Sequence, residues 1–229
     1  MNNDFTLEVG RTAIDLIQPR LISFEPEVSS KLTEKDVSIK MQVALVLAAK
    51  KEFEKAARTL EKIVFESMSS QFTPAQKVNV YINCAEHWFE EEDSVNAETF
   101  INKAAHLIHL VDAQELVIRY KVCHSRVLDS KRKFELAANA YYSLSIQEGV
   151  DPEDLETLLN MALTCAVLAP AGQMKSIIIT SLIKDERSKK LEFYAILESM
   201  FYGKVIRKQD VKAFEEGLQP HQKTKSADG

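Results

Sequence analysis

Two stretches of this sequence decide its fold: KRKFELAANAYYSLS, from Lys131 to Ser145, and KKEFEKAARTLEKI, from Lys50 to Ile63. In each stretch an alanine follows the phenylalanine by three positions, and a large apolar residue follows it by seven. A third, weaker copy, DSVNAETFINKA, has Ser94 where the others have Phe53 and Phe134. These three anchor positions are separated by 41 and then 40 residues. A fixed interval of this length indicates an internal structural repeat.

Small and large residues recur at four positions around each anchor. The small ones lie three positions after and nine positions before it: Ala56, Ala97, Ala137, Ala44, Ala85 and Ser125. The large ones lie seven after and six before it: Leu60, Ile101, Tyr141, Leu47, Trp88 and Leu128. Small residues facing each other let two antiparallel helices approach closely. We therefore predict an all-α, right-handed solenoid of helical hairpin repeats, tetratricopeptide-like or HEAT-like but longer than 34 residues.

Capping signals and spacing predict where the elements begin. Thr73 precedes Pro74 in an N-cap arrangement, Asp112 and Glu115 have capping-box spacing, and Asp151 precedes Pro152. A fourth unit is predicted to start there, since Ala166 follows Ser125 by 41 residues.

The repeat interval of about 40 residues, and the point where it fades, predict three regions along the chain. Residues 1–170 are expected to form a helical-repeat arm, and residues 171–218 to form further helices, at about 172–184, 188–202 and 208–217. The polar segment 219–229 is expected to be a disordered tail.

Composition narrows the class of protein. The 229 residues are 45% hydrophobic and include only six glycines and six prolines, which favours a mostly helical globular chain. The net charge of −5 provides no general attraction to nucleic acid or to anionic membranes. No apolar run approaches the roughly 20 residues of a membrane span, and the first residues do not resemble a signal peptide. Three widely spaced cysteines, Cys84, Cys123 and Cys165, are expected to be free buried thiols in a reducing compartment.

Residues that could carry chemistry do not form a recognisable motif. His106 and His109 are spaced one helical turn apart, but a third metal ligand is missing and a partly exposed helix edge is the better interpretation. Cys123 and His124 are adjacent and should point to different faces. No glycine-rich phosphate loop is present. We therefore expect no catalytic, cofactor or metal site, with an unrecognised hydrolase as the alternative that bound metal would revive.

The acidic run Glu90, Glu91, Glu92 and Asp93 follows Trp88 and is the one candidate partner-contact patch. It is either a solvated turn or a docking surface for a basic partner. The basic residues between Arg119 and Lys133 are interleaved with a single aromatic residue, Tyr120, which is too little for base stacking and argues against nucleic-acid binding.

Several blocks of sequence resemble one known family, subunit four of the COP-9 signalosome, within the PCI-domain proteins. They are LIQPRLISFE (Leu16 to Glu25), YKVCHSRVLDSKRKF (Tyr120 to Phe134), AGQ (Ala171 to Gln173), KDERSKKLEFYAILESM (Lys184 to Met200) and LQPHQKTKSADG (Leu218 to Gly229). In that family a helical-repeat arm leads into a PCI domain, whose second half is a winged helix followed by a long C-terminal helix. The resemblance covers nearly the whole chain but does not reach the winged helix, so the chain is expected to be the arm portion.

The resemblance implies a non-catalytic scaffold and substrate-sensing subunit, cytoplasmic and nuclear, that supports deneddylation of cullin–RING ubiquitin ligases. Its partners would be other signalosome subunits and cullin–RING components, without cofactor, small-molecule substrate, nucleic acid or membrane. Two alternatives remain at this point: the paralogous twelfth non-ATPase subunit of the proteasome lid, and a free-standing peptide-binding repeat module.

Overall fold

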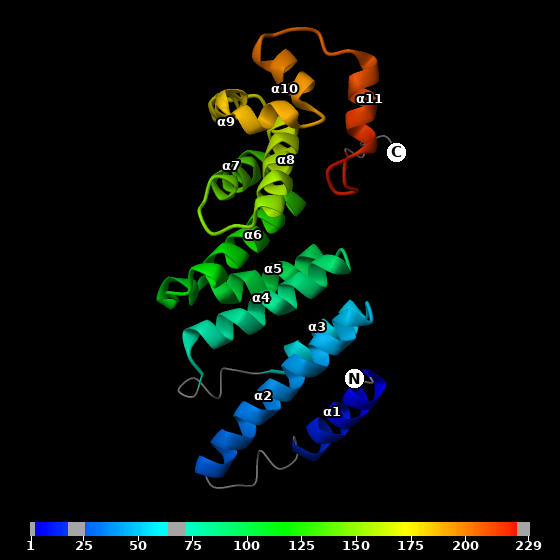
Figure 1. Ribbon diagram of the computed structural model, residues 1–229, viewed down its shortest axis with the longest axis vertical. Coiled ribbons are helices and arrows are strands. Elements are labelled where there is room, and N and C mark those ends of the chain that lie inside the picture. Colours follow the sequence, from blue (N-terminus) through cyan, green and yellow to red (C-terminus); the bar gives the residue numbers. More distant parts are fainter. Residues whose placement is uncertain (1–2, 18–25, 64–71, 224–229) are drawn as a thin grey trace. The chain divides into compact units, whose positions relative to one another are not determined.

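The computed structural model describes residues 3–17, 26–63 and 72–223, and every regular element in these ranges is a helix (Figure 1). The all-α prediction is confirmed for these residues. The elements are α1 (Asn3–Ile17), α2 (Pro26–Ala49), α3 (Phe53–Glu61), α4 (Pro74–Glu90), α5 (Ser94–Ala105), η3 (Ile108–Leu110), α6 (Gln114–Ser130), α7 (Phe134–Ser145), α8 (Pro152–Leu168), α9 (Gln173–Lys184), η4 (Glu186–Lys190), α10 (Tyr194–Phe201) and α11 (Lys208–Glu216).

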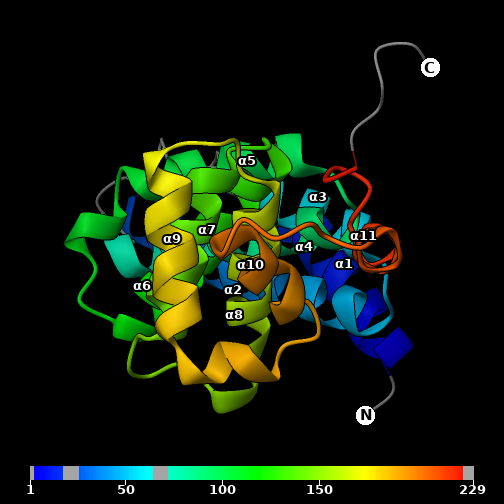
Figure 2. The same ribbon diagram turned by 90° about the horizontal axis from the view of Figure 1, so that it is seen from above.

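The chain divides into two compact units, Met1–Tyr120 and Lys121–Gly229. In the first unit, α1 packs on α2, α2 on α3, α3 on α4 and α4 on α5. In the second, α7 packs on α8, and α9 contacts both of them (Figure 2). This division lies inside α6 and does not coincide with the predicted boundary at residue 170, which stays a prediction.

The predicted hairpins are present, and the anchor positions have a common structural meaning. Phe53, Ser94 and Phe134 are the first residues of α3, α5 and α7. The six predicted small positions are all buried. Their burial follows from close helix approach, because a larger side chain there would force the two helices of a hairpin apart.

The three hairpin turns share one backbone geometry. Lys51, Glu92 and Arg132 are in the left-handed region, with φ of 61°, 58° and 59°, and they follow the same 41 and 40 residue intervals. In the turn that contains Glu92, its N–H donates to the Phe89 carbonyl (3.2 Å), and the next N–H donates to the Trp88 carbonyl (3.0 Å). The other two turns have the same pair of bonds. This is the Schellman ending of a helix, here built without the usual glycine.

The fourth hairpin, α8 and α9, ends its first helix differently. Pro170 follows directly after Ala169, the C-cap of α8, and no residue of this turn is in the left-handed region. The Lys175 ammonium instead donates to the carbonyls of Val167 (2.9 Å) and Ala169 (2.6 Å). At this helix end a lysine side chain thus bonds the last carbonyls of α8. In the other three hairpins, backbone N–H groups of the left-handed turn bond the corresponding carbonyls.

Helix starts agree with the capping signals in part. Thr73 and Gln76 form a reciprocal capping box at the start of α4, as expected. Asp151 occupies the N-cap position of α8 with Pro152 following, but the Asp151 side chain makes no capping hydrogen bond. The helix expected at 188–202 is split into η4 and α10.

The disordered tail expected at 219–229 stays a prediction. The structure describes its first five residues, Gln219 to Lys223, which contain a turn, and Gln222 is only 6% exposed. The physical reason is a set of hydrogen bonds to the turn between α6 and α7. Residues 224–229 lie outside the described residues.

Candidate functional site

The acidic run forms the turn between α4 and α5. Glu90 is the last residue of α4, and Asp93 is the N-cap of α5. The side chains of Glu90, Glu91 and Glu92 are exposed. The sequence placed this patch correctly at a helix end, and its role as a partner contact stays a prediction.

Two of the four carboxylates accept hydrogen bonds from backbone N–H groups at helix starts. The Asp93 carboxylate accepts from the Asn96 N–H at 3.0 Å, which caps α5. The Glu91 carboxylate accepts from the Glu54 N–H at 3.1 Å, near the start of α3. Negative charge at a helix N-terminus is favourable because of the helix dipole. Glu90 and Glu92 are therefore the members of the run whose replacement leaves these two helix starts intact.

A basic cavity of about 350 Å³ lies between α1, α2 and α3. Its cations are Arg11, Lys40, Lys55, Arg58 and Lys62. Three of them already have carboxylate partners: the Lys40 ammonium lies 2.6 Å from Asp36, Lys55 lies 2.7 Å from Glu52, and Arg58 lies 2.8 Å from Glu54. The local charge is thus largely balanced, and the cavity does not by itself indicate an anionic ligand.

The histidine and cysteine candidates do not come together. His106 is the C-cap of α5 and His109 lies in η3, so they do not share a helix, and both are exposed. Cys123 is buried while His124 is exposed, as their adjacency predicted. Among the described residues, no three side chains of His, Cys, Asp or Glu are grouped so that they could hold a metal ion.

The three cysteines are free and buried, as predicted. Burial raises the pKa of the Cys84 and Cys165 thiols well above the usual range, because a thiolate would be poorly solvated there. The nearby Glu61 and Asp129 carboxylates raise them further. A protonated thiol is a poor nucleophile, so these two cysteines suit packing better than catalysis.

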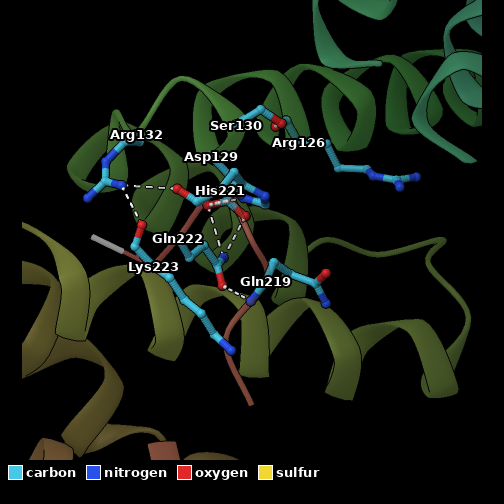
Figure 3. Close-up of polar contacts among 8 residues, drawn as sticks. All are labelled: Arg126, Asp129, Ser130, Arg132, Gln219, His221, Gln222 and Lys223. Atoms are coloured by element: carbon cyan, nitrogen blue, oxygen red, sulfur yellow. Dashed lines mark hydrogen bonds and ion pairs between the residues drawn. The ribbon is translucent and has the colours of Figure 1, made fainter. Parts of the chain in front are cut away.

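A polar cluster between distant segments joins the α6–α7 turn to Gln219–Lys223, which we call the strap (Figure 3). The Gln222 amide donates to both oxygens of the Asp129 carboxylate, at 3.1 and 3.0 Å. The Arg132 guanidinium donates to the carbonyls of His221 and Lys223, both at 3.1 Å. The His221 Nε2 atom lies 3.3 Å from the same carboxylate.

Sequence reasoning missed this cluster, although one signal was available. Asp129 lies five positions before its anchor, where the other two repeats have Ala48 and Phe89. A carboxylate at a position that is apolar in the sister units is not explained by hairpin packing. The strap partners could not have been identified, because they lie about 90 residues further along the chain.

These features define an all-α helical-repeat protein, with exposed turns and a polar strap site in place of a recognisable catalytic centre among its described residues. No described helix is both long and apolar enough to cross a lipid bilayer.

Residues 3–153 match the family model described as PSMD12/CSN4, N-terminal, and the chain belongs to this family. It is 37% identical to the COP9 signalosome complex subunit 4 of Dictyostelium discoideum over 99% of its length, and 37% identical to that of Drosophila melanogaster over 99%. The Arabidopsis thaliana subunit 4 is 36% identical over 96% of the chain. The resemblance inferred from sequence blocks is confirmed. The chain spans about half the length of these relatives, 54 to 55%.

Proposed function

We propose that this chain acts as a non-catalytic scaffold and substrate-sensing subunit of the COP9 signalosome, and that it supports deneddylation of cullin–RING ubiquitin ligases through protein–protein contacts. The observation that carries the proposal is the alignment of nearly the whole chain with proteins named COP9 signalosome complex subunit 4. The same proposal places it in the cytoplasm and the nucleus, with other signalosome subunits and cullin–RING components as partners.

The helical repeats support a contact role on physical grounds. A stack of hairpins contacts mainly its neighbours along the chain, so small movements at successive joints can add up without disrupting any single core. Exposed turns between the helices then offer side chains to partners. Glu90 and Glu92 are the residues of the acidic turn that we assign to contact with a basic partner surface.

The proposed function is tested by removing the chain from its own cells and measuring the neddylated fraction of cullins by immunoblot. We expect that fraction to rise, and re-expression of the wild-type protein to restore it. A variant with His106→Ala, His109→Ala and His124→Ala, three exposed histidines, should restore it equally well. An unchanged cullin pattern after complete removal would contradict the deneddylation role, and failure of the triple variant alone would contradict the non-catalytic assignment.

The acidic turn is tested separately, by a Glu90→Lys, Glu92→Lys variant in co-purification with signalosome subunits and cullin–RING components. A matched control is Glu215→Lys, Glu216→Lys, which reverses two exposed glutamates at the end of α11. We expect the first variant to lose a partner that the control retains, with unchanged thermal stability. Equal recovery of every partner by both variants would show that the run is a solvated turn.

A further inference from the structure

The strap is held by one buried pair, Asp129 and Gln222, and by one exposed side chain, Arg132. Asp129 is 7% exposed and Gln222 is 6% exposed, so their hydrogen bonds are shielded from water. A buried carboxylate whose partner is removed loses its compensation for desolvation, which is costly. Arg132 holds two strap carbonyls, those of His221 and Lys223, rather than side chains. The turn therefore holds the strap through its backbone and through Gln222.

The strap is also folded upon itself, so that it presents one fixed shape to the turn. The Gln222 N–H donates to the Gln219 carbonyl at 3.0 Å, and the Gln219 N–H donates to the Gln222 side-chain oxygen at 3.1 Å. The side-chain bond fixes the orientation of the Gln222 amide, so that its nitrogen faces Asp129 (Figure 3). Pre-ordering of this kind lowers the entropy lost when the strap docks.

The turn that receives the strap is modified relative to its sister turns. Arg132 occupies the left-handed position where the other hairpins have Lys51 and Glu92. Asp129 takes the place of Ala48 and Phe89, and its backbone carbonyl accepts the Arg132 N–H at 2.8 Å. The shared turn geometry thus brings a carboxylate and a guanidinium together only at the third hairpin.

We propose that the strap and this turn form a clasp that couples α6 and α7 to the α11 end of the second unit. The α6–α7 turn and the segment from α11 to the strap then open together, as one cooperative segment. Contacts in a solenoid otherwise run mainly between sequence neighbours. The clasp instead joins residues 93 positions apart. Phe214 of α11 packs edge-on against Phe193, the N-cap residue of α10, with the two ring centroids 5.1 Å apart. This contact links α11, and with it the strap, to α10. The clasp stands independently of the proposed function.

Hydrogen exchange of the full chain, read by mass spectrometry, tests this coupling. Gln222→Ala tests the clasp more directly than Asp129→Ala does. Replacing Asp129 would also remove its contact with the Cys165 thiol. We expect Gln222→Ala to raise amide exchange about tenfold in residues 208–223 and, across the clasp, in the α6–α7 turn. Asp129→Ala should raise exchange in the same two regions. The double variant should exchange little faster than either single variant, since both substitutions remove the two hydrogen bonds between Gln222 and Asp129.

A matched control is Glu186→Ala, which removes an exposed carboxylate of the same unit that pairs with Lys189 at 2.7 Å. It should leave exchange in both regions unchanged. Faster exchange confined to the mutated side in either variant would overturn the proposal. Additive effects of the two substitutions would do the same, because they would show two independent sites rather than one clasp.

Discussion

Replacing Glu92 by glycine should stabilise the first unit, although it removes a side chain from the acidic turn. Glu92 has φ of 58°, a conformation that costs an L-residue roughly 1 to 2 kcal/mol. Glycine adopts it freely but loses about 0.5 to 1 kcal/mol more backbone entropy on folding. Subtracting the two ranges leaves a net gain of about 0 to 1.5 kcal/mol, with a central value of about 0.75 kcal/mol.

Thermal unfolding followed by circular dichroism measures the effect, with Glu92→Ala as the control. The alanine variant removes the same charge but keeps the left-handed strain, so its unfolding midpoint should match the wild type. For a unit of this size the glycine variant should unfold roughly 3 °C higher.

Arg132→Gly should gain less than Glu92→Gly, because it also loses the bonds to the strap. A midpoint for Glu92→Gly at or below that of Glu92→Ala would refute the reasoning from turn geometry.

Three further predictions concern single side chains. Asp93→Ala should lower the free energy of unfolding by about 1 kcal/mol, because it removes the cap of α5. Asp151→Ala should change this free energy far less, because the Asp151 side chain makes no capping bond. Urea unfolding compares the two variants. Gly10→Ala should destabilise α1 by roughly 1 kcal/mol, since its new Cβ would lie 2.5 Å from the stiff Val43 side chain, and faster exchange in α1 would show it. Burial lowers the pKa of His87. The contribution of the neutral imidazole to stability is therefore present above about pH 6.5 and is lost as the pH falls below that value. A His87→Gln variant should show a smaller drop in unfolding midpoint than the wild type between about pH 7.5 and 5.5.

The hairpins could be predicted from sequence because close helix packing restricts residue size at fixed positions. Ala56, Ala97 and Ala137 are completely buried, and this constraint is visible even though Ser94 departs from the pattern. The left-handed turns could not be predicted in the same way. Lys51, Glu92 and Arg132 have no residue preference for positive φ, and the surrounding helix packing imposes the conformation.

The candidate site was predictable in position but not in detail. The acidic run was correctly placed at a helix end, yet the bonds of Glu91 and Asp93 depend on backbone groups that a charge pattern does not reveal. The strap was missed because Gln219 to Lys223 has the composition of a disordered tail. Its position arises from Asp129 and Arg132, whose proximity depends on the tertiary fold.

Affinity purification of the tagged chain from its own cells, with mass spectrometry of the co-purifying proteins, tests the central claim most directly. We expect signalosome subunits and cullin–RING components, recovered in constant proportion in repeated preparations. Recovery of proteasome lid subunits in their place, or of neither set, would contradict it.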